Sequence, residues 1–172
     1  DYNYQLELKK QIVEDAMHSI YGKEVEVRDV IPSPQNREYR HKIQYPVAET
    51  KESKRILAGY FKTGSHEIVN IKYCPIQPSY CDEIIDYIRV TAKKFSVSGY
   101  DERKHAGDLK HVVIRASNYN NNRALVILVI NSVKMLEKIK KLAEAVYDKF
   151  ANVSGVGINF NPKKTNLSLI HI

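Results

Sequence analysis

Short stretches in which apolar and polar residues alternate occur along this chain, and they come in pairs. Longer stretches with the spacing of an amphipathic helix separate the pairs. Paired strands favour antiparallel hairpins, and the helices between them can cover one side of the sheet. We therefore expect an α+β fold with a mostly antiparallel sheet and helices packed on one face. The expected strands are 25–31, 39–47, 55–61, 67–71, 109–116, 123–130, 153–160 and 166–172, and the expected helices are 8–22, 80–95 and 132–150.

The segment from Gly59 to Ile76 is the most informative of these stretches. Two short strands are joined there by the turn Thr63-Gly64-Ser65, and the segment ends with Cys74 followed by proline. Together with the basic stretch 39–42, it predicts a sheet with cationic and aromatic tips. Such a surface suits a nucleic acid.

The strand expected at 39–47 places its charged residues on one face. Tyr39, His41, Ile43, Tyr45 and Val47 share one side, and Arg40, Lys42 and Gln44 share the other. Strand geometry separates Arg40 and Lys42 by about 7 Å. Two cations at that separation can contact neighbouring phosphates. An ordinary solvated sheet face would show the same alternation.

Other basic residues fall near this strand. Lys62, His66 and Lys72 lie on nearby strands or turns, and Arg115 ends the strand 109–116. The turn 161–166 carries two lysines. Each can contact phosphate, or can be an ordinary exposed residue. Among the aromatic residues, Tyr60 and Phe61 are the candidates for stacking on a base, although aromatic residues more often fill a core.

Composition sets the broad class of the protein. The chain has 172 residues, of which 43% are hydrophobic and 27% are charged, as in a globular domain. A net charge of +7 favours polyanions such as RNA, DNA or an anionic membrane surface, although it can also serve solubility alone. The longest apolar run, 124–130, is too short to span a bilayer. With two cysteines and no secretory pattern, we expect a cytoplasmic location and no membrane partner.

Both ends of the chain interrupt a pattern of regular structure. Residues 1–4 open within a helical stretch without an initiator methionine, and residues 167–172 stop within an apolar strand. An uncapped apolar edge strand promotes aggregation. We therefore expect the chain to be a fragment of a longer protein.

Local motifs give no support for catalysis. The sequence contains no Gly-rich phosphate loop, no G-x-S-x-G elbow and no Gly-rich turn typical of an S-adenosylmethionine site. Cys74 and Cys81 are too far apart for a Cys-x-x-Cys metal hairpin, and two thiols alone cannot complete a zinc or iron–sulfur site. From the residues alone, each cysteine is expected to be a small buried side chain.

Five segments, taken in order, resemble one family. Together they are similar to the central domain of the S-adenosylmethionine-dependent RNA (uracil-5-)-methyltransferases of the RumA/TrmA type. The resemblance covers nearly the whole chain, and its specificity comes from the order of motifs that are individually weak. The segments are Tyr4–Lys10, Tyr39–Lys42, Gly64–Val69 with Cys74–Ile76, Leu109–Arg115 and Asn159–Asn166.

The resemblance implies a division of labour within a larger enzyme. Such enzymes often carry an N-terminal TRAM domain, then the central domain, then a C-terminal Rossmann-like domain with the catalytic cysteine, the base and the S-adenosylmethionine site. Residues 1–172 would form a single central, RNA-gripping domain that contacts the missing catalytic domain in cis. No catalytic or cofactor-binding residue is therefore expected in this chain, and the fragment alone should be inactive.

The resemblance also bears on a metal cofactor. Many members bind a 4Fe-4S cluster through three closely spaced cysteines and one distant cysteine. Cys74 matches the distant ligand, whereas Cys81 matches no ligand position. The three other ligands would precede the first helix. We thus expect a cluster, if one exists, in the parent protein rather than in this fragment.

The function implied by the resemblance is methyl transfer to uridine C5 of ribosomal or transfer RNA. In such enzymes a cysteine thiolate adds to C6 of an extruded uracil, C5 attacks the methyl sulfonium, and a base removes the C5 proton. The central domain would hold the RNA. The residues expected to do so are Arg40 and Lys42, followed by Lys62, His66 and Arg115. The alternatives are a stand-alone nucleic-acid-binding or interaction module, and a scaffold whose charge only serves solubility.

Overall fold

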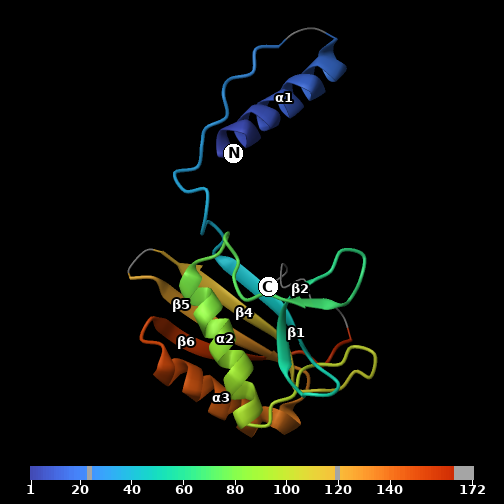
Figure 1. Cartoon of the computed structure of the whole chain (residues 1–172), viewed down its shortest axis with the longest axis vertical. Coiled ribbons are helices and arrows are strands. Elements are labelled where there is room, and N and C mark those ends of the chain that lie inside the picture. The colour runs from blue at the N-terminus through green and yellow to red at the C-terminus, as the bar shows by residue number, and fades with distance from the viewer. Residues whose placement is uncertain (23–24, 119–120, 165–172) are drawn as a thin grey trace. The chain divides into compact units, whose positions relative to one another are not determined.

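A computed structural model describes residues 1–22, 25–118 and 121–164 of the chain. The chain divides into two compact units, Asp1–Arg37 and Glu38–Ile172, and each is described by itself (Figure 1). The strand expected at 166–172 lies outside the described residues.

The first unit contains one helix, α1 (Tyr2–Tyr21). Its start is capped by the Asp1 carboxylate, which accepts a hydrogen bond from the Asn3 N–H at 3.0 Å. Gly22 ends it in the left-handed region at φ 64°, and its N–H donates to the His18 carbonyl. The predicted helix ending near Gly22 is confirmed. None of its residues is buried.

The strand predicted at 25–31 is wrong, because residues 25–30 have no regular structure and pair with no strand in the described chain. This segment is instead connected to α1 by side chains. Lys10 Nζ lies 2.7 Å from Asp29 Oδ1, and the Ser33 N–H donates to the Tyr2 hydroxyl at 2.8 Å. The hydrogen bond from Lys10 lowers the pKa of the Asp29 carboxyl.

The second unit is built on a six-stranded sheet of order β3-β2-β1-β4-β5-β6. Neighbouring strands are antiparallel except β5 and β6, which are parallel and are joined through a helix. The predicted α+β class with a mostly antiparallel sheet is confirmed. The strands are β1 (Lys42–Glu49), β2 (Ile56–Phe61), β3 (Ile68–Asn70), β4 (Leu109–Ser117), β5 (Arg123–Ile130) and β6 (Val153–Phe160).

The first strand of the sheet begins three residues later than the alternation predicts. Glu38 has a positive φ of 53°, and the N–H groups of Glu38 and Arg40 donate to the carbonyls of Pro75 and Ile76 instead of joining a strand ladder. Tyr39, which was placed on the apolar face, is consequently 54% exposed. His41, placed with it, is also exposed.

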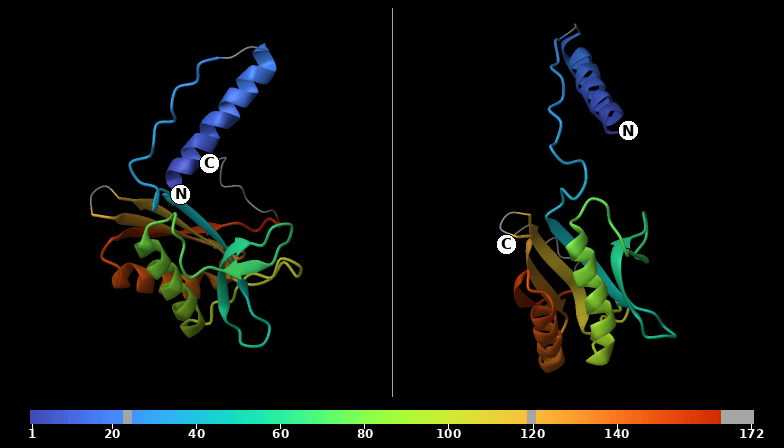
Figure 2. Two further views of the ribbon diagram at one scale, coloured as in Figure 1. Left: turned by 45° about the horizontal axis from the view of Figure 1, so that its top comes forward. Right: turned by 60° about the vertical axis from the view of Figure 1, so that its left-hand side comes forward.

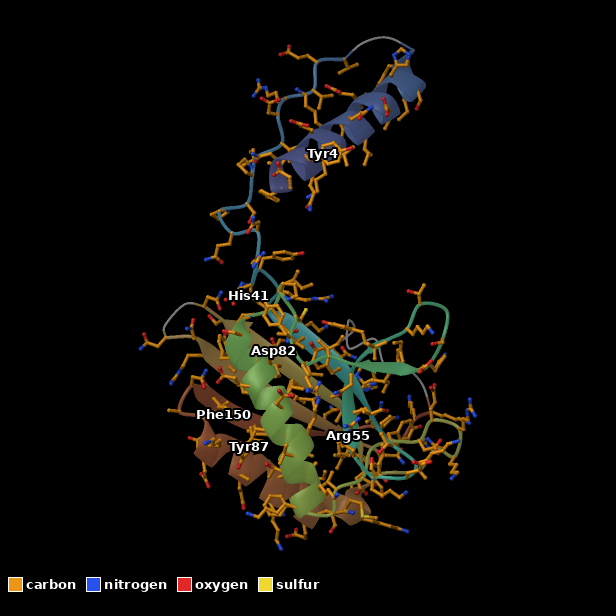
Figure 3. All side chains as sticks on the ribbon, viewed as in Figure 1. Tyr4, His41, Arg55, Asp82, Tyr87 and Phe150 are labelled. Atoms are coloured by element: carbon orange, nitrogen blue, oxygen red, sulfur yellow. The ribbon has the colours of Figure 1, made fainter. Side chains whose placement is uncertain are left out.

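Two helices cover one face of the sheet, α2 (Ser79–Lys94) and α3 (Leu136–Lys149) (Figures 1 and 2). They match the helices predicted at 80–95 and 132–150, except that a 3-10 turn (Val133–Met135) precedes α3. Their buried side chains form the core with the inward residues of the strands. Tyr87 of α2 meets Phe150, which follows α3, edge to face at 5.5 Å (Figure 3). The largest fully buried core residues include Ile43, Tyr45, Ile56, Ile84, Ile85, Ile88, Leu128, Ile139 and Leu142.

A buried arginine connects α2 to the β2–β3 hairpin. The side chain of Arg89 is 8% exposed and donates to the backbone carbonyls of Ala58 and Ile71, while also pairing with Asp86. The two strands approach closely at Gly59, where an added Cβ would lie 1.8 Å from the Val69 carbonyl oxygen. Only glycine therefore allows this pairing.

No helix in the described part of the chain is both long enough and apolar enough to cross a membrane.

Candidate nucleic-acid interface

Two cations lie directly opposite each other on the sheet face that the helices do not cover. Lys42 of β1 pairs in register with Arg115 of β4, and antiparallel partners place their side chains on the same face. Ile43, Tyr45 and Val47, which alternate with Lys42, are buried on the helix side. Lys42 is half-buried and Arg115 is exposed.

Within the described residues, no acidic side chain neutralises the Lys42–Arg115 pair. Among the residues that the structure describes, neither side chain has an acidic partner within ion-pair distance. Like charges in directly opposite positions destabilise a sheet. An anion bound between the two side chains would relieve that repulsion, so this position suits a phosphate.

A third cation, Arg123, joins this pair. In the β4–β5 ladder Arg115 pairs with Leu125 and Ser117 with Arg123, so Arg123 lies diagonally from Arg115 on the same face. Diagonal neighbours of this kind are about 7–8 Å apart. Arg123 is exposed. We call Lys42, Arg115 and Arg123 the sheet cation cluster.

The sequence interpretation did not select Arg123. The signal was present, because the predicted hairpin strands 109–116 and 123–130 place Arg115 and Arg123 on either side of one turn. Two cations flanking a hairpin turn can share one face. The exact register decides whether they do, and it depends on the length of the turn.

Arg40 is directed away from the sheet cation cluster. Its Nη1 donates to the Tyr60 hydroxyl at 3.0 Å, and its guanidinium carbon lies 5.6 Å from the centroid of the Tyr60 ring. Tyr60 in turn packs edge to face on Tyr45, which is buried on the helix side of β1. The alternation that placed Arg40 beside Lys42 does not extend to Arg40, because β1 begins at Lys42.

Lys62 and His66 lie at the turn between β2 and β3, outside the sheet cation cluster. Lys62 is exposed, and its backbone N–H donates to the Glu67 carbonyl. The His66 ring nitrogen Nδ1 is 2.6 Å from Glu102 Oε2, and the ring lies 5.4 Å from that of Phe61. Phe61 is 39% exposed and remains accessible for stacking.

A pocket of about 650 Å³ lies between this turn and the loop that precedes β4. Its lining mixes both signs of charge with aromatic rings, including Phe61, His66, Tyr100, Glu102 and His111. Burial, and then the neighbouring Lys110, lower the pKa of His111 to about 4, so its imidazole is neutral near pH 7. The buried Lys110 donates to the carbonyls of Asn161 and Lys163. Neither residue therefore presents a free cation to this pocket.

Neither cysteine belongs to a group of side chains that could hold a metal ion within the described residues. Cys74 is buried, and its backbone N–H donates to Asp82. Cys81 is fully buried on α2, and burial raises the pKa of its thiol to about 12. In the described ranges no group of three or more His, Cys, Asp and Glu side chains could hold a metal ion. These residues do not fit a 4Fe-4S cluster, which needs four ligands.

The fold and the cations on the open face of the sheet indicate the class of protein, which is an α+β domain with a face suited to a polyanion. Known proteins narrow this class. No family model matches the chain. It is 33% identical over 168 residues to an uncharacterized RNA methyltransferase of Clostridium tetani and 34% identical over 166 residues to one of Fusobacterium nucleatum.

These matches cover 98% and 96% of this chain but only 36% and 35% of the relatives, so the chain spans about a third of their length. It is therefore related in sequence to part of proteins named as RNA methyltransferases.

The fold is similar to that of a solved structure. The crystal structure of Pyrococcus abyssi tRNA (uracil-54, C5)-methyltransferase in complex with S-adenosyl-L-homocysteine matches with a TM-score of 0.71 and 23% identity. The match covers 98% of this chain and 36% of that one. At this level of identity the likeness concerns the fold.

Proposed function

We propose that this chain is the RNA-holding central domain of an S-adenosylmethionine-dependent methyltransferase that modifies uridine C5 in ribosomal or transfer RNA. The observation that carries the proposal is the match of nearly the whole chain to about a third of several RNA methyltransferases. Its fold neighbour is named as a tRNA uracil-C5 methyltransferase. The sheet cation cluster adds a surface with the charge that RNA requires.

In this proposal the chain binds RNA and does not carry out the chemistry. Lys42, Arg115 and Arg123 contact phosphates, and Lys62 on the β2–β3 turn extends the contact. Arg40 and His66 already have protein partners, Tyr60 and Glu102, so they make RNA contacts only if those pairs open. S-adenosylmethionine supplies the methyl group at a site that we place outside residues 1–172.

The proposal has consequences for the parent protein. Residues 1–172 act as one functional domain and contact a catalytic domain of the same protein, and the protein acts in the cytoplasm, where its RNA substrate is found. An iron–sulfur cluster in the parent would need three cysteines from outside this chain, with Cys74 as the fourth ligand.

The activity can be tested in the organism that carries the gene. The parent gene is deleted and then restored, and 5-methyluridine is measured by mass spectrometry in separated ribosomal and transfer RNA. We expect one 5-methyluridine site to disappear and to return. If every site persists, and the gene encodes no S-adenosylmethionine domain beside these residues, the chain is a stand-alone binding module instead.

The binding role can be tested on the chain itself. The double variant Lys42→Gln with Arg115→Gln should weaken binding to an oligoribonucleotide and lower the salt slope by about 1.4, because two phosphate contacts on a single strand are lost. The matched control is Lys9→Gln with Lys149→Gln, which removes two exposed lysines elsewhere. Equal affinity and slope in both variants would argue for a scaffold.

A further inference from the structure

A second cationic surface lies between the end of α2 and the start of α3. These two helix ends lie at the same end of the helix layer (Figure 1). It is a groove of about 440 Å³. The residues that line it come from two segments about forty positions apart in the sequence. They are Lys94, Phe95, Ser96, Lys134, Met135, Glu137, Lys138 and Lys141. We call this surface the lysine groove.

One of the four lysines has a structural role. Lys138 Nζ lies 2.7 Å from the buried Asp108 carboxylate and donates to the Ser96 carbonyl at 2.8 Å. Ser96, with a positive φ of 55°, terminates α2 and directs this carbonyl. Lys138 thus joins the two helix ends and is already neutralised.

The other three lysines have no neutralising partner in the described part of the chain. Lys94, Lys134 and Lys141 are exposed, and within the described residues no acidic group forms an ion pair with any of them. Glu137, the acidic residue of the groove, instead pairs with Lys140 at 3.0 Å. The groove therefore has an excess of positive charge at its rim.

The position of Lys134 does not stabilise α3. Lys134 and Lys138 lie at the N-terminal end of α3, where the helix dipole disfavours cations. Lys94 differs, because it lies at the C-terminal end of α2, where a cation is favourable. Helix stability therefore does not account for Lys134.

The groove also offers apolar surface between the charges. Phe95 and Met135 are half-buried, and Lys94 Nζ lies 5.9 Å from the centroid of the Phe95 ring. Cationic grooves with an aromatic side chain are suited to single-stranded nucleic acid, because lysines follow the phosphates while a base stacks on the ring. A duplex would present no unstacked base to Phe95.

We propose that the lysine groove binds a single-stranded segment of RNA, with phosphates at Lys94, Lys134 and Lys141 and a base against Phe95. The choice of RNA as ligand rests on the proposed function. The site itself is separate, because the lysine groove is formed by the helix layer, whereas the sheet cation cluster is on the opposite face of the sheet. The domain thus contacts RNA with both of its faces.

The test compares three double variants of the full chain: Lys134→Gln with Lys141→Gln in the groove, Lys42→Gln with Arg115→Gln in the sheet cation cluster, and the control Lys9→Gln with Lys149→Gln. Binding of fluorescent oligouridylate is measured by anisotropy at several salt concentrations. The groove variant should bind roughly tenfold more weakly at low salt and lose about 1.4 from the salt slope. Its thermal midpoint should change little, because both lysines are exposed and form no ion pair within the described residues.

A second variant tests the stacking contact. Phe95→Leu should weaken oligouridylate binding by a similar factor at every salt concentration, with the slope unchanged, and should leave heparin binding unaffected. If the groove variant binds RNA like the control, the lysine groove is not an RNA site. The proposed RNA-binding function would then be judged from the sheet variant alone. Equal loss of heparin and RNA binding in Phe95→Leu would also overturn the stacking site. If the groove binds an acidic peptide and not RNA, the proposed ligand is wrong.

Discussion

The two faces of the sheet in the second unit are organised by different forces. On the helix-covered face, Ile43, Tyr45 and Val47 of β1 are buried against α2 and α3. On the opposite face the same strand presents Lys42, which lies beside Arg115 of β4. The side chains of β1 therefore alternate between the close-packed core and the cationic surface.

The difference between the faces separates residues that hold the fold from residues that are free to bind. Burial of apolar surface stabilises the helix-covered face, with about 1.5–3 kcal/mol for each large side chain. The sheet cation cluster contributes repulsion instead of stability. Substitutions on the two faces should thus differ in whether they change unfolding or RNA affinity.

The largest effect is expected in the core. Ile84→Ala on α2 removes a side chain with 0% exposure and should lower the free energy of unfolding by about 4 kcal/mol, because it leaves a cavity. Denaturant unfolding followed by circular dichroism measures the loss. Val90→Ala on the same helix is the control, since Val90 is 75% exposed and should change stability little. Similar losses for both variants would contradict the assignment of faces.

Arg89 should give the next largest effect. Arg89→Met keeps most of the side-chain volume but leaves the carbonyls of Ala58 and Ile71 without this donor, which should cost about 3 kcal/mol. Hydrogen exchange should show the β2–β3 hairpin opening before the rest of the sheet. Lys93→Met, an exposed change on the same helix, serves as the control. An undisturbed hairpin would show that Arg89 does not hold it in place.

A smaller effect is expected from pH. Burial lowers the pKa of His111 from 6.5 to about 4, so between these values the unfolded chain binds a proton that the folded chain does not. Stability is therefore complete above about pH 6.5 and falls as pH is lowered toward 4, by on the order of 2 kcal/mol. His111→Gln should make the pH profile flatter than in the parent chain. His18→Gln, at an exposed position, is the control for the loss of an imidazole.

The smallest effect on stability is expected for the sheet cation cluster. Lys42→Gln with Arg115→Gln should leave the free energy of unfolding unchanged or raise it by about 0.5 kcal/mol, since a like-charge pair is removed. Differential scanning calorimetry can resolve the sign. A clear loss of stability would mean that the two cations support the fold, which would abolish the contrast between the faces.

Secondary structure could be predicted well where the hydrophobic pattern extended over many residues and the segment packs against partners in the fold. The helices at 80–95 and 132–150 and the hairpin strands 109–116 and 123–130 are of this kind. The strand predicted at 25–31 failed because alternation does not reveal whether a partner strand exists. The start of β1 was misplaced because Pro75 and Ile76, which are distant in sequence, accept the hydrogen bonds of Glu38 and Arg40.

The candidate sites depended more heavily on tertiary structure. Lys42 and Arg115 could be named from their residue type and strand position, but their pairing depends on a register between strands about seventy residues apart. The sequence could not show that Arg40 differs from Lys42, because the contact between Arg40 and Tyr60 depends on the position of β2 in the fold. The lysine groove is formed by two helix ends, and no local pattern connects Lys94 with Lys134.

The parallel pairing of β5 and β6 has a consequence for how the domain is made. In a hairpin such as β4–β5, pairing can begin at the turn and extend along the strands. In contrast, β6 pairs with β5 only after the chain has crossed over through α3. The loop-closure entropy of that crossover must be overcome before the ladder forms. On a ribosome, the edge of β5 therefore stays unpaired until residues 153–160 have emerged, and in this interval the exposed edge can pair wrongly.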